Sequence, residues 1–323
     1  MKIISLFSGA GGLDLGLIQA GHEIVWANDI FIDAVETYKL NIGDHVDIRD
    51  ISDIPSSEIP DADVVVGGFP CQGFSVANWG RTVGDSRNRL YREMVRVVSE
   101  KRPRFFVAEN VKGLVSLGKG AVLENIIKDF TEVGYRTCWK VLNSADYGAP
   151  QKRMRFVMLG IREDLDDNGV SFPPKATHQS PDAKEKQAGL KKWLTVGEAL
   201  AHIPEPENAP HIPNHEYSKY KLRFNGHLGH RRIDPNLPAP TVTGRGDEKG
   251  GVVVLHHPNN HRRMSARELA AVQSFPDDFV FKGTKTSAYR QIANAVPPKL
   301  GLAIGKMLAA NEALAECEFE AAE

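Results

Sequence analysis

The sequence predicts an α/β protein with a mostly parallel sheet and a second, smaller, loop-rich domain. In the first half of the chain, short apolar runs rich in β-branched and aromatic residues alternate with segments of helical spacing. Such alternation is typical of βαβ units, whose strands pair in parallel with helices on both faces of the sheet. After residue 170, proline and histidine become frequent and helical periodicity nearly vanishes. The 323 residues suffice for both domains.

Each expected element follows from local periodicity and from the residues that bound it. Buried strands are expected over 2–7, 23–28, 63–68 and 104–109, with further strands within 135–148 and 154–162. Helices are expected over 12–21, 31–41, 88–101, 265–273 and 297–310. The last helix has an apolar stripe and should return to pack on the first domain. We therefore expect one domain over 1–171 and 284–323, and another over 172–283.

The composition excludes several classes of protein. The formal net charge is −1, and no apolar run approaches the length of a membrane span. The three cysteines, Cys71, Cys138 and Cys317, have no paired spacing, which argues against a disulfide framework and against a cysteine-based zinc site. Because the N-terminus does not resemble a secretory signal, we expect a reducing cytoplasmic compartment and no membrane partner.

Positive charge is concentrated in one part of the loop-rich region. Between residues 211 and 263, three lysines and six arginines accompany four acidic residues, and seven of the eleven histidines lie there too. A local basic face of this kind suits a nucleic-acid partner even in a chain of nearly neutral charge. The adjacent His256 and His257 have no cysteine or acidic cluster beside them in the sequence, so no metal site is expected.

A glycine-rich segment, FSGAGGLD (7–14), follows the first expected strand and opens the first helix. Glycines there let backbone N–H groups approach a ligand at the positive end of a helix. Asp29 ends the second strand, where a carboxylate can accept hydrogen bonds from ribose hydroxyl groups. Because Asp14 replaces the third glycine of a dinucleotide fingerprint, the loop suits the amino-acid end of S-adenosylmethionine better than a pyrophosphate. A tight turn without a ligand is the alternative.

A cysteine and a carboxylate follow two of the expected strands. Cys71 lies just beyond one strand, in GGFPCQGFS (67–75), and Glu109 ends the next. The carboxyl ends of parallel strands meet at one edge of a sheet, which should bring these side chains together. A cysteine reacts as its thiolate, so Cys71 beside a methyl sulfonium predicts covalent catalysis on an electron-poor ring. From these residues alone, a buried structural thiol is an equal alternative.

Taken together, the motifs resemble the cytosine-C5 DNA methyltransferases of the bacterial restriction–modification type, including HaeIII-type members. The matching segments occur in the family's order and span nearly the whole chain: SLFSGAGGLDLGL (5–17), RDISDIP (49–55), GGFPCQGFS (67–75), ENVKGL (109–114), DYGAPQKRMRFVMLG (146–160), RRIDPNLPAPTVT (231–243), RRMSARELAAVQSFPDDF (262–279) and YRQIANAVPPKLG (289–301). Ala293 departs from the family's usual glycine, and little effect on cofactor binding is expected because alanine is small. The resemblance implies a Rossmann-like S-adenosylmethionine-dependent methyltransferase fold, with a target-recognition domain and hinge over 172–283.

The resemblance implies a DNA (cytosine-5) methyltransferase that acts through Cys71. This thiolate would add to C6 of cytosine, while Glu109 would contact N3 and the 4-amino group. Arg153 and Arg155 would hold the O2 side of the cytosine and the glutamate. Of the two, Arg155 is the expected direct contact and Arg153 is the second candidate. The target cytosine must leave the base stack for this chemistry.

The implied cofactor is S-adenosylmethionine, which is released as S-adenosylhomocysteine. Phe7 would meet the adenine, the glycine loop the methionine end, and Asp29 the ribose. The residues implied to bind the cofactor are Phe7, Ser8, Gly9, Ala10, Gly11, Gly12, Leu13, Asp29, Ile30, Asp50, Ile51, Phe69, Pro70, Asn294 and Val296.

The implied partner is double-stranded DNA, contacted by the basic region and by the segment 75–89, which resembles the family's closing loop. Affinity for DNA comes from phosphate contacts and specificity from contacts to base edges. The expected DNA-binding residues are Gln72, Ser75, Arg87, Arg223, Arg231, Arg232 and Arg245, with Arg262 and Arg263 as further candidates. A monomer is expected, and a cognate restriction endonuclease acting separately is the other partner that the resemblance suggests.

Three alternatives stay open at this level. The same chemistry on cytosine in transfer RNA would keep the catalytic residues and change the substrate. A catalytically silent DNA-binding regulator would be free to lose Cys71, Glu109 and Arg155, all of which are present. A nicotinamide-dependent oxidoreductase would explain the glycine loop and leave the other motifs without a role.

Overall fold

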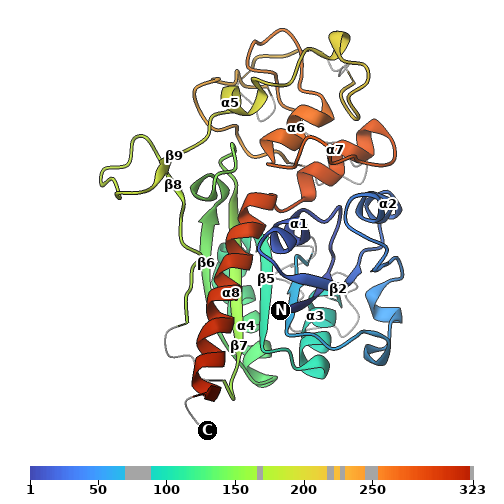
Figure 1. Cartoon of the computed structure of the whole chain (residues 1–323), viewed down its shortest axis with the longest axis vertical. Coiled ribbons are helices and arrows are strands. Elements are labelled where there is room, and N and C mark those ends of the chain that lie inside the picture. Colours follow the sequence, from blue (N-terminus) through green and yellow to red (C-terminus); the bar gives the residue numbers. More distant parts are fainter. Residues whose placement is uncertain (70–88, 166–169, 217–221, 226–229, 244–253, 321–323) are drawn as a thin grey trace.

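The computed structural model describes residues 1–69, 89–165, 170–216, 222–225, 230–243 and 254–320. A sheet flanked by helices forms the lower part of the view in Figure 1, and loops with the short helices α5 to α7 lie above it. Within the described residues, no helix has the length and apolar character needed to cross a bilayer.

A seven-stranded sheet with the order β3-β2-β1-β4-β5-β7-β6 forms the centre of the lower part. Its strands are β1 (Lys2–Leu6), β2 (Glu23–Asn28), β3 (Val46–Asp47), β4 (Val64–Gly67), β5 (Phe105–Val111), β6 (Tyr135–Asn143) and β7 (Met154–Arg162). The first five strands pair in parallel. β7 runs antiparallel to both β5 and β6. The mostly parallel sheet expected from the sequence is therefore confirmed, with an antiparallel pair at one edge.

Helices cover both faces of the sheet because buried side chains alternate along its strands. Ile3 and Val64 point to one face, where they share a core with α1, α2 and α8. Ile4 and Val65 point to the other, where they pack with α3 and α4. The bounds of these helices are α1 (Gly12–Gln19), α2 (Ile32–Asn41), α3 (Arg89–Lys101), α4 (Ala121–Glu132) and α8 (Pro298–Glu320).

The C-terminal helix α8 packs against α1, as its apolar stripe predicts. Glycines make this close approach feasible. A Cβ atom on Gly16 would lie 2.3 Å from the carbonyl oxygen of Pro298, and one on Gly301 would lie 2.6 Å from that of Leu13. The last helix of the chain, α8, therefore packs against the back of α1, the helix that follows the glycine loop.

The upper part has a hydrophobic cluster of its own. It surrounds the helices α5 (Val196–Leu200), α6 (Ala266–Val272) and α7 (Lys285–Asn294), while a short parallel pair, β8 (His178–Gln179) and β9 (Lys191–Lys192), lies to one side. Ala10 of the glycine loop belongs to the same cluster, so this loop touches both parts of the molecule. The division into domains at residues 171 and 284 stays a prediction.

Candidate active site

Asp29, at the end of β2, holds the glycine loop between β1 and α1. Its Oδ2 accepts a hydrogen bond from the Gly9 N–H at 2.8 Å, and its Oδ1 accepts one from the Phe31 N–H at 2.8 Å. Burial raises the pKa of the Asp29 carboxyl, and these two hydrogen bonds oppose the shift. Gly9 and Gly11 have φ values of 55° and 82°, which favour glycine. A Cβ atom on Gly9 would meet nothing within 4 Å, so this backbone faces open space.

The end of α7 and the residues after it lie against the other side of the glycine loop. A Cβ atom on Gly12 would lie 2.4 Å from the carbonyl oxygen of Val296. Val296 is buried and Asn294 is exposed. Ala293, the departure from the family pattern, is buried in the upper cluster. The glycine loop and the segment 293–296 therefore lie directly against each other.

We expect Gly12→Ala to destabilise this junction. The added methyl group must push against backbone, and overpacking of this kind costs about 1–3 kcal/mol. Thermal unfolding should show a lower Tm, and calorimetric titration should show weaker binding of S-adenosylmethionine. Gly113→Ala is the matched control, because the nearest atom to its added Cβ would be 4.0 Å away. Equal Tm values for Gly12→Ala and the wild type would contradict the close packing.

The remaining residues expected to bind a cofactor differ in how far their side chains are exposed to solvent. Phe7 is half-buried, and Ile30 is 62% exposed, so both offer apolar surface beside the glycine loop. The Ile51 side chain is in the core, which leaves only its backbone to face a ligand. Asp50 caps the following turn by accepting hydrogen bonds from the N–H and the hydroxyl of Ser52. The side chains of Leu13 and Phe69 are also buried, and that of Ser8 is half-buried.

Asp14, the acidic residue of the glycine segment, faces the interior of the protein. Its carboxylate accepts hydrogen bonds from the Ser5 hydroxyl at 2.7 Å and the Tyr38 hydroxyl at 2.8 Å. These contacts join β1, α1 and α2 directly behind the loop. Burial raises the pKa of the Asp14 carboxyl to about 6, and the two hydrogen bonds limit the rise.

Asp14→Asn should remove a pH-dependent part of the stability. The folded pKa of about 6 exceeds the ordinary 3.8, so the folded state binds this proton more tightly. The contribution of Asp14 to the free energy of unfolding therefore falls as pH rises from about 4 to about 6, by up to about 3 kcal/mol. Urea unfolding of both proteins at a pH of about 4 and of about 7 measures this change. If the free energies of unfolding of wild type and variant differ by the same amount at both pH values, the raised pKa of Asp14 is contradicted.

Glu109 and Arg155 form a buried ion pair at the edge of the sheet where β5 ends. β5 and β7 are neighbours, and their register places Val111 opposite Arg155. The Arg155 Nε atom lies 2.8 Å from Glu109 Oε1. Burial raises the pKa of the Glu109 carboxyl, against the opposing charges of Arg155 and Arg153. The site therefore holds a carboxyl group that retains a proton more readily than an ordinary glutamate does.

This ion pair adjoins the end of β4. A Cβ atom on Gly68 would lie 3.1 Å from Glu109 Oε2. The Asn110 side-chain amide donates a hydrogen bond to the Phe69 carbonyl at 2.9 Å, which fixes the chain as it leaves β4. Six of the predicted site residues lie outside the described residues, namely Pro70, Cys71, Gln72, Ser75, Arg87 and Arg245.

Arg153 has surroundings quite different from those of Arg155. It is fully buried, and its Nη1 donates a hydrogen bond to the Val242 carbonyl at 2.7 Å. Its Nη2 donates to the carbonyls of Ala293 and Ala295, at 2.7 and 2.9 Å. The guanidinium thus ties the start of β7 to the loop-rich region and to the C-terminal end of α7. These bonds favour a positioning role over direct contact with a base.

The arginines of the loop-rich region fall into two groups. Arg223, Arg231 and Arg232 are exposed, and the Arg232 guanidinium lies over the Phe224 ring at 4.4 Å. By contrast, Arg262 and Arg263 are buried. Arg262 is paired with Glu268, and Arg263 donates to the Val254 carbonyl. The guanidinium groups of these last two are used inside the protein, which argues against the expected contacts with DNA.

Comparison with known proteins agrees with this arrangement. Residues 1–310 match the family model described as C-5 cytosine-specific DNA methylase. The chain is 40% identical to the type II methyltransferase M.NgoFVII of Neisseria gonorrhoeae, over 92% of this chain and 83% of the relative. It is 36% identical to the type II methyltransferase M.FnuDI of Fusobacterium nucleatum, over 95% and 94% of the two chains.

Solved structures give the same result for the fold. A prophage-encoded DNA modification methyltransferase of Escherichia coli superposes with a TM-score of 0.74 and 27% identity, covering 96% of this chain and 99% of that one. The Dnmt2 methyltransferase of Schizosaccharomyces pombe, at 21% identity and a TM-score of 0.68 over 96% and 99% of the chains, shares the fold. Because the family model matches nearly the whole length of this chain, the chain belongs to the C-5 cytosine-specific DNA methylases and is a DNA (cytosine-5) methyltransferase.

Proposed function

We propose that this methyltransferase takes a methyl group from S-adenosylmethionine and places it on C5 of a flipped cytosine in double-stranded DNA, through a covalent adduct with Cys71. The observation that carries the proposal is the buried Glu109–Arg155 pair beside the end of β4. Phe69 is held next to this pair, and Cys71 follows it by two residues. A carboxyl, a guanidinium and a thiol are the groups that addition to a cytosine ring requires.

In the proposed reaction, the Cys71 thiolate forms a bond to C6, and the electron pair of the C5–C6 double bond moves onto the ring. Glu109, with its raised pKa, donates a hydrogen bond or proton to N3 as negative charge develops there. C5 would then form a bond to the methyl carbon as the bond from that carbon to the sulfonium sulfur breaks, with S-adenosylhomocysteine as the leaving group. Loss of the C5 proton to a base, return of any N3 proton to Glu109 and departure of the thiolate from C6 would restore the aromatic ring.

Arg155 supports this chemistry electrostatically. It holds the Glu109 carboxyl through Nε, and its Nη1 donates to the Met154 carbonyl at 2.9 Å. The guanidinium is thereby fixed before substrate arrives, so no reorganisation is needed when charge appears on the cytosine. We propose that its remaining N–H groups face O2 of the base.

The glycine loop fits S-adenosylmethionine. The open space in front of Gly9 admits the methionine end close to the backbone, and Asp29 places a half-buried carboxylate where the ribose would bind. Phe7 and Ile30 supply apolar surface for an adenine. When bound, this cofactor supplies an electrophilic methyl group on a sulfonium. In this proposal, Asn294 and Val296 contact the cofactor from the side opposite the glycine loop.

The loop-rich region, residues 172–283, is proposed to recognise the DNA target. Its exposed Arg223, Arg231 and Arg232 can reach phosphates or base edges. Both relatives named above are type II methyltransferases, which supports a role in a restriction–modification system, with a separate endonuclease cutting the unmodified site. We propose that the methyltransferase acts as a monomer.

Base-resolution methylation sequencing tests the proposal. A host lacking DNA methylation would express either the wild type or Cys71→Ser. We expect 5-methylcytosine at one short sequence motif with the wild type and none with the variant. Unmodified DNA, in cells whose wild-type protein is soluble and binds S-adenosylmethionine, would contradict the proposed substrate, and host transfer RNA would be analysed next.

A further inference from the structure

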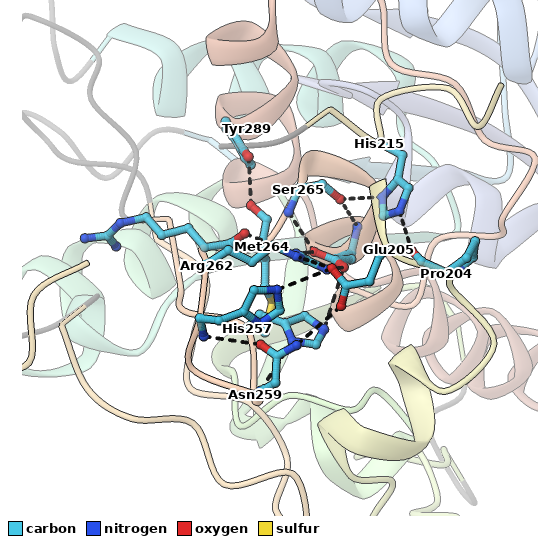
Figure 2. Close-up of polar contacts among 12 residues, drawn as sticks. Pro204, Glu205, His215, His257, Asn259, Arg262, Met264, Ser265 and Tyr289 are labelled. Atoms are coloured by element: carbon cyan, nitrogen blue, oxygen red, sulfur yellow. Dashed lines mark hydrogen bonds and ion pairs between the residues drawn. The ribbon is translucent and has the colours of Figure 1, made fainter. Parts of the chain in front are cut away.

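A cluster of two histidines and a glutamate lies in the loop-rich region, apart from the proposed active site. One ring nitrogen each of His257 and His261 and one carboxylate oxygen of Glu205 all lie within 4.8 Å of one another. Figure 2 shows Glu205, His257 and Arg262 gathered together, with Asn259 beside them. The geometry points to a binding site for one Zn²⁺ ion, held by His257, His261 and Glu205.

A tight turn brings the two histidines to the same side. The His257 N–H donates a hydrogen bond to the Arg262 carbonyl at 2.9 Å, and the Asn260 N–H donates to the His257 carbonyl at 2.8 Å. Asn260 has a φ of 61°, a left-handed conformation that asparagine tolerates. The resulting spacing, histidine followed by histidine after three residues, is one that zinc sites use. Glu205 comes from a different loop and faces the turn.

The third ligand is already aimed at the histidines. Glu205 Oε2 lies 3.5 Å from His261 Nε2 and accepts a hydrogen bond from Arg262 Nε at 2.7 Å. Its other oxygen, Oε1, has a long hydrogen bond of 3.3 Å from the Asn259 side chain. Ligands around Zn²⁺ lie about 2.0–2.2 Å from the ion. Small movements of exposed side chains would therefore close the site.

The charges of the cluster leave room for a cation. Arg262 is bound at two points by the buried Glu268, at 2.6 and 2.7 Å, so it keeps a partner if Glu205 turns to an ion. Glu268 and Glu205 together carry one negative charge more than Arg262 neutralises.

The identity of the ion follows from the ligands. Two imidazoles and one carboxylate suit Zn²⁺, whereas Ca²⁺ and Mg²⁺ take oxygen ligands. Three protein ligands leave a fourth position for water. The side chains of His261 and Glu205 are 50% and 38% exposed, which gives an ion access from solvent. Because the ion would join two loops distant in the sequence, it would stabilise the recognition region against unfolding.

The site is tested with tag-free protein from which metal has been removed with EDTA. One measurement is a titration with Zn²⁺ in competition with a chromogenic chelator, and the other is thermal unfolding with and without Zn²⁺. We expect one equivalent to bind and Tm to rise by about 2 °C or more. His261→Ala should weaken binding by about 100-fold or more and abolish the Tm rise. His261 is half-exposed, so this variant should fold. His202→Ala is the matched control, since His202 is an exposed histidine paired with Asp277 elsewhere.

Two results would overturn the site. One is the absence of wild-type binding tighter than about 10 μM. The other is binding that stays unchanged in both His261→Ala and Glu205→Gln, which would place the ion elsewhere. Co²⁺ gives a further readout, because three nitrogen and oxygen ligands with one water produce the visible absorption of tetrahedral Co²⁺. That band should appear in the wild type and in His202→Ala, and be absent from His261→Ala.

Discussion

Cys71→Ser is expected to lower the rate of methyl transfer by about 10⁴-fold or more while leaving the affinity for S-adenosylmethionine nearly unchanged. A serine hydroxyl is not ionised at neutral pH and adds poorly to C6 of cytosine. The cofactor, by contrast, is proposed to contact the glycine loop and Asp29, which this change leaves intact. Single-turnover transfer of a radiolabelled methyl group and calorimetric titration measure the two quantities separately.

Cys138→Ser is the matched control for this prediction. Cys138 lies in β6, and burial raises the pKa of its thiol to about 11, so it stays protonated and unreactive. This variant should methylate DNA at close to the wild-type rate. Retained turnover in Cys71→Ser would exclude the covalent route.

Glu109→Gln is expected to reduce kcat by about 10²–10⁴-fold, the range that loss of a general acid produces. A glutamine amide can donate a hydrogen bond to N3 but has no proton to transfer to it. Its oxygen can still face Arg155 Nε, which lies 2.8 Å from the carboxylate in the wild type. The variant should therefore fold and bind S-adenosylmethionine. Single-turnover rates with saturating DNA measure the effect on chemistry.

The control for Glu109→Gln is Glu124→Gln, a change of the same kind at an exposed position of α4. This second variant should have the rate and Tm of the wild type. If Glu109→Gln also retains the wild-type kcat, the carboxyl has no part in activating the ring. An unchanged Tm is needed in each case to separate catalysis from folding.

Much of the sheet could be predicted because its central strands are buried on both faces. The apolar runs at 23–28 and 63–68 correspond to β2 and β4, whose flanking glycines and polar residues mark the ends. β3, with two residues, is too short to leave a periodic signal. The antiparallel direction of β7 depends on its pairing with β5 and β6, which a local pattern does not contain.

The site shows the same difference between local and distant information. Glu109 lies near the end of β5 and the glycine loop follows β1, so their placement at the same edge of the sheet could be expected. The hydrogen bonds from Arg153 to Val242 and Ala293 join segments far apart in the chain, and no spacing reveals them. Asn110 was missed as the anchor of Phe69, although its place directly after Glu109 at a strand end is a usable signal. No metal site was predicted at His257, because Glu205 is far from it in the sequence and only the fold brings the two side chains together.

The most direct test of the central claim is mass spectrometry of protein trapped on DNA that carries 5-fluorocytosine at the methylated motif. Elimination needs a removable C5 proton, which fluorine replaces, so the adduct should survive denaturation in the presence of S-adenosylmethionine. We predict a covalent complex whose peptide map places the modified base, methylated at C5, on the sulfur of Cys71. A motif that is methylated in its ordinary form but yields no adduct, or an adduct on another residue, would contradict the account.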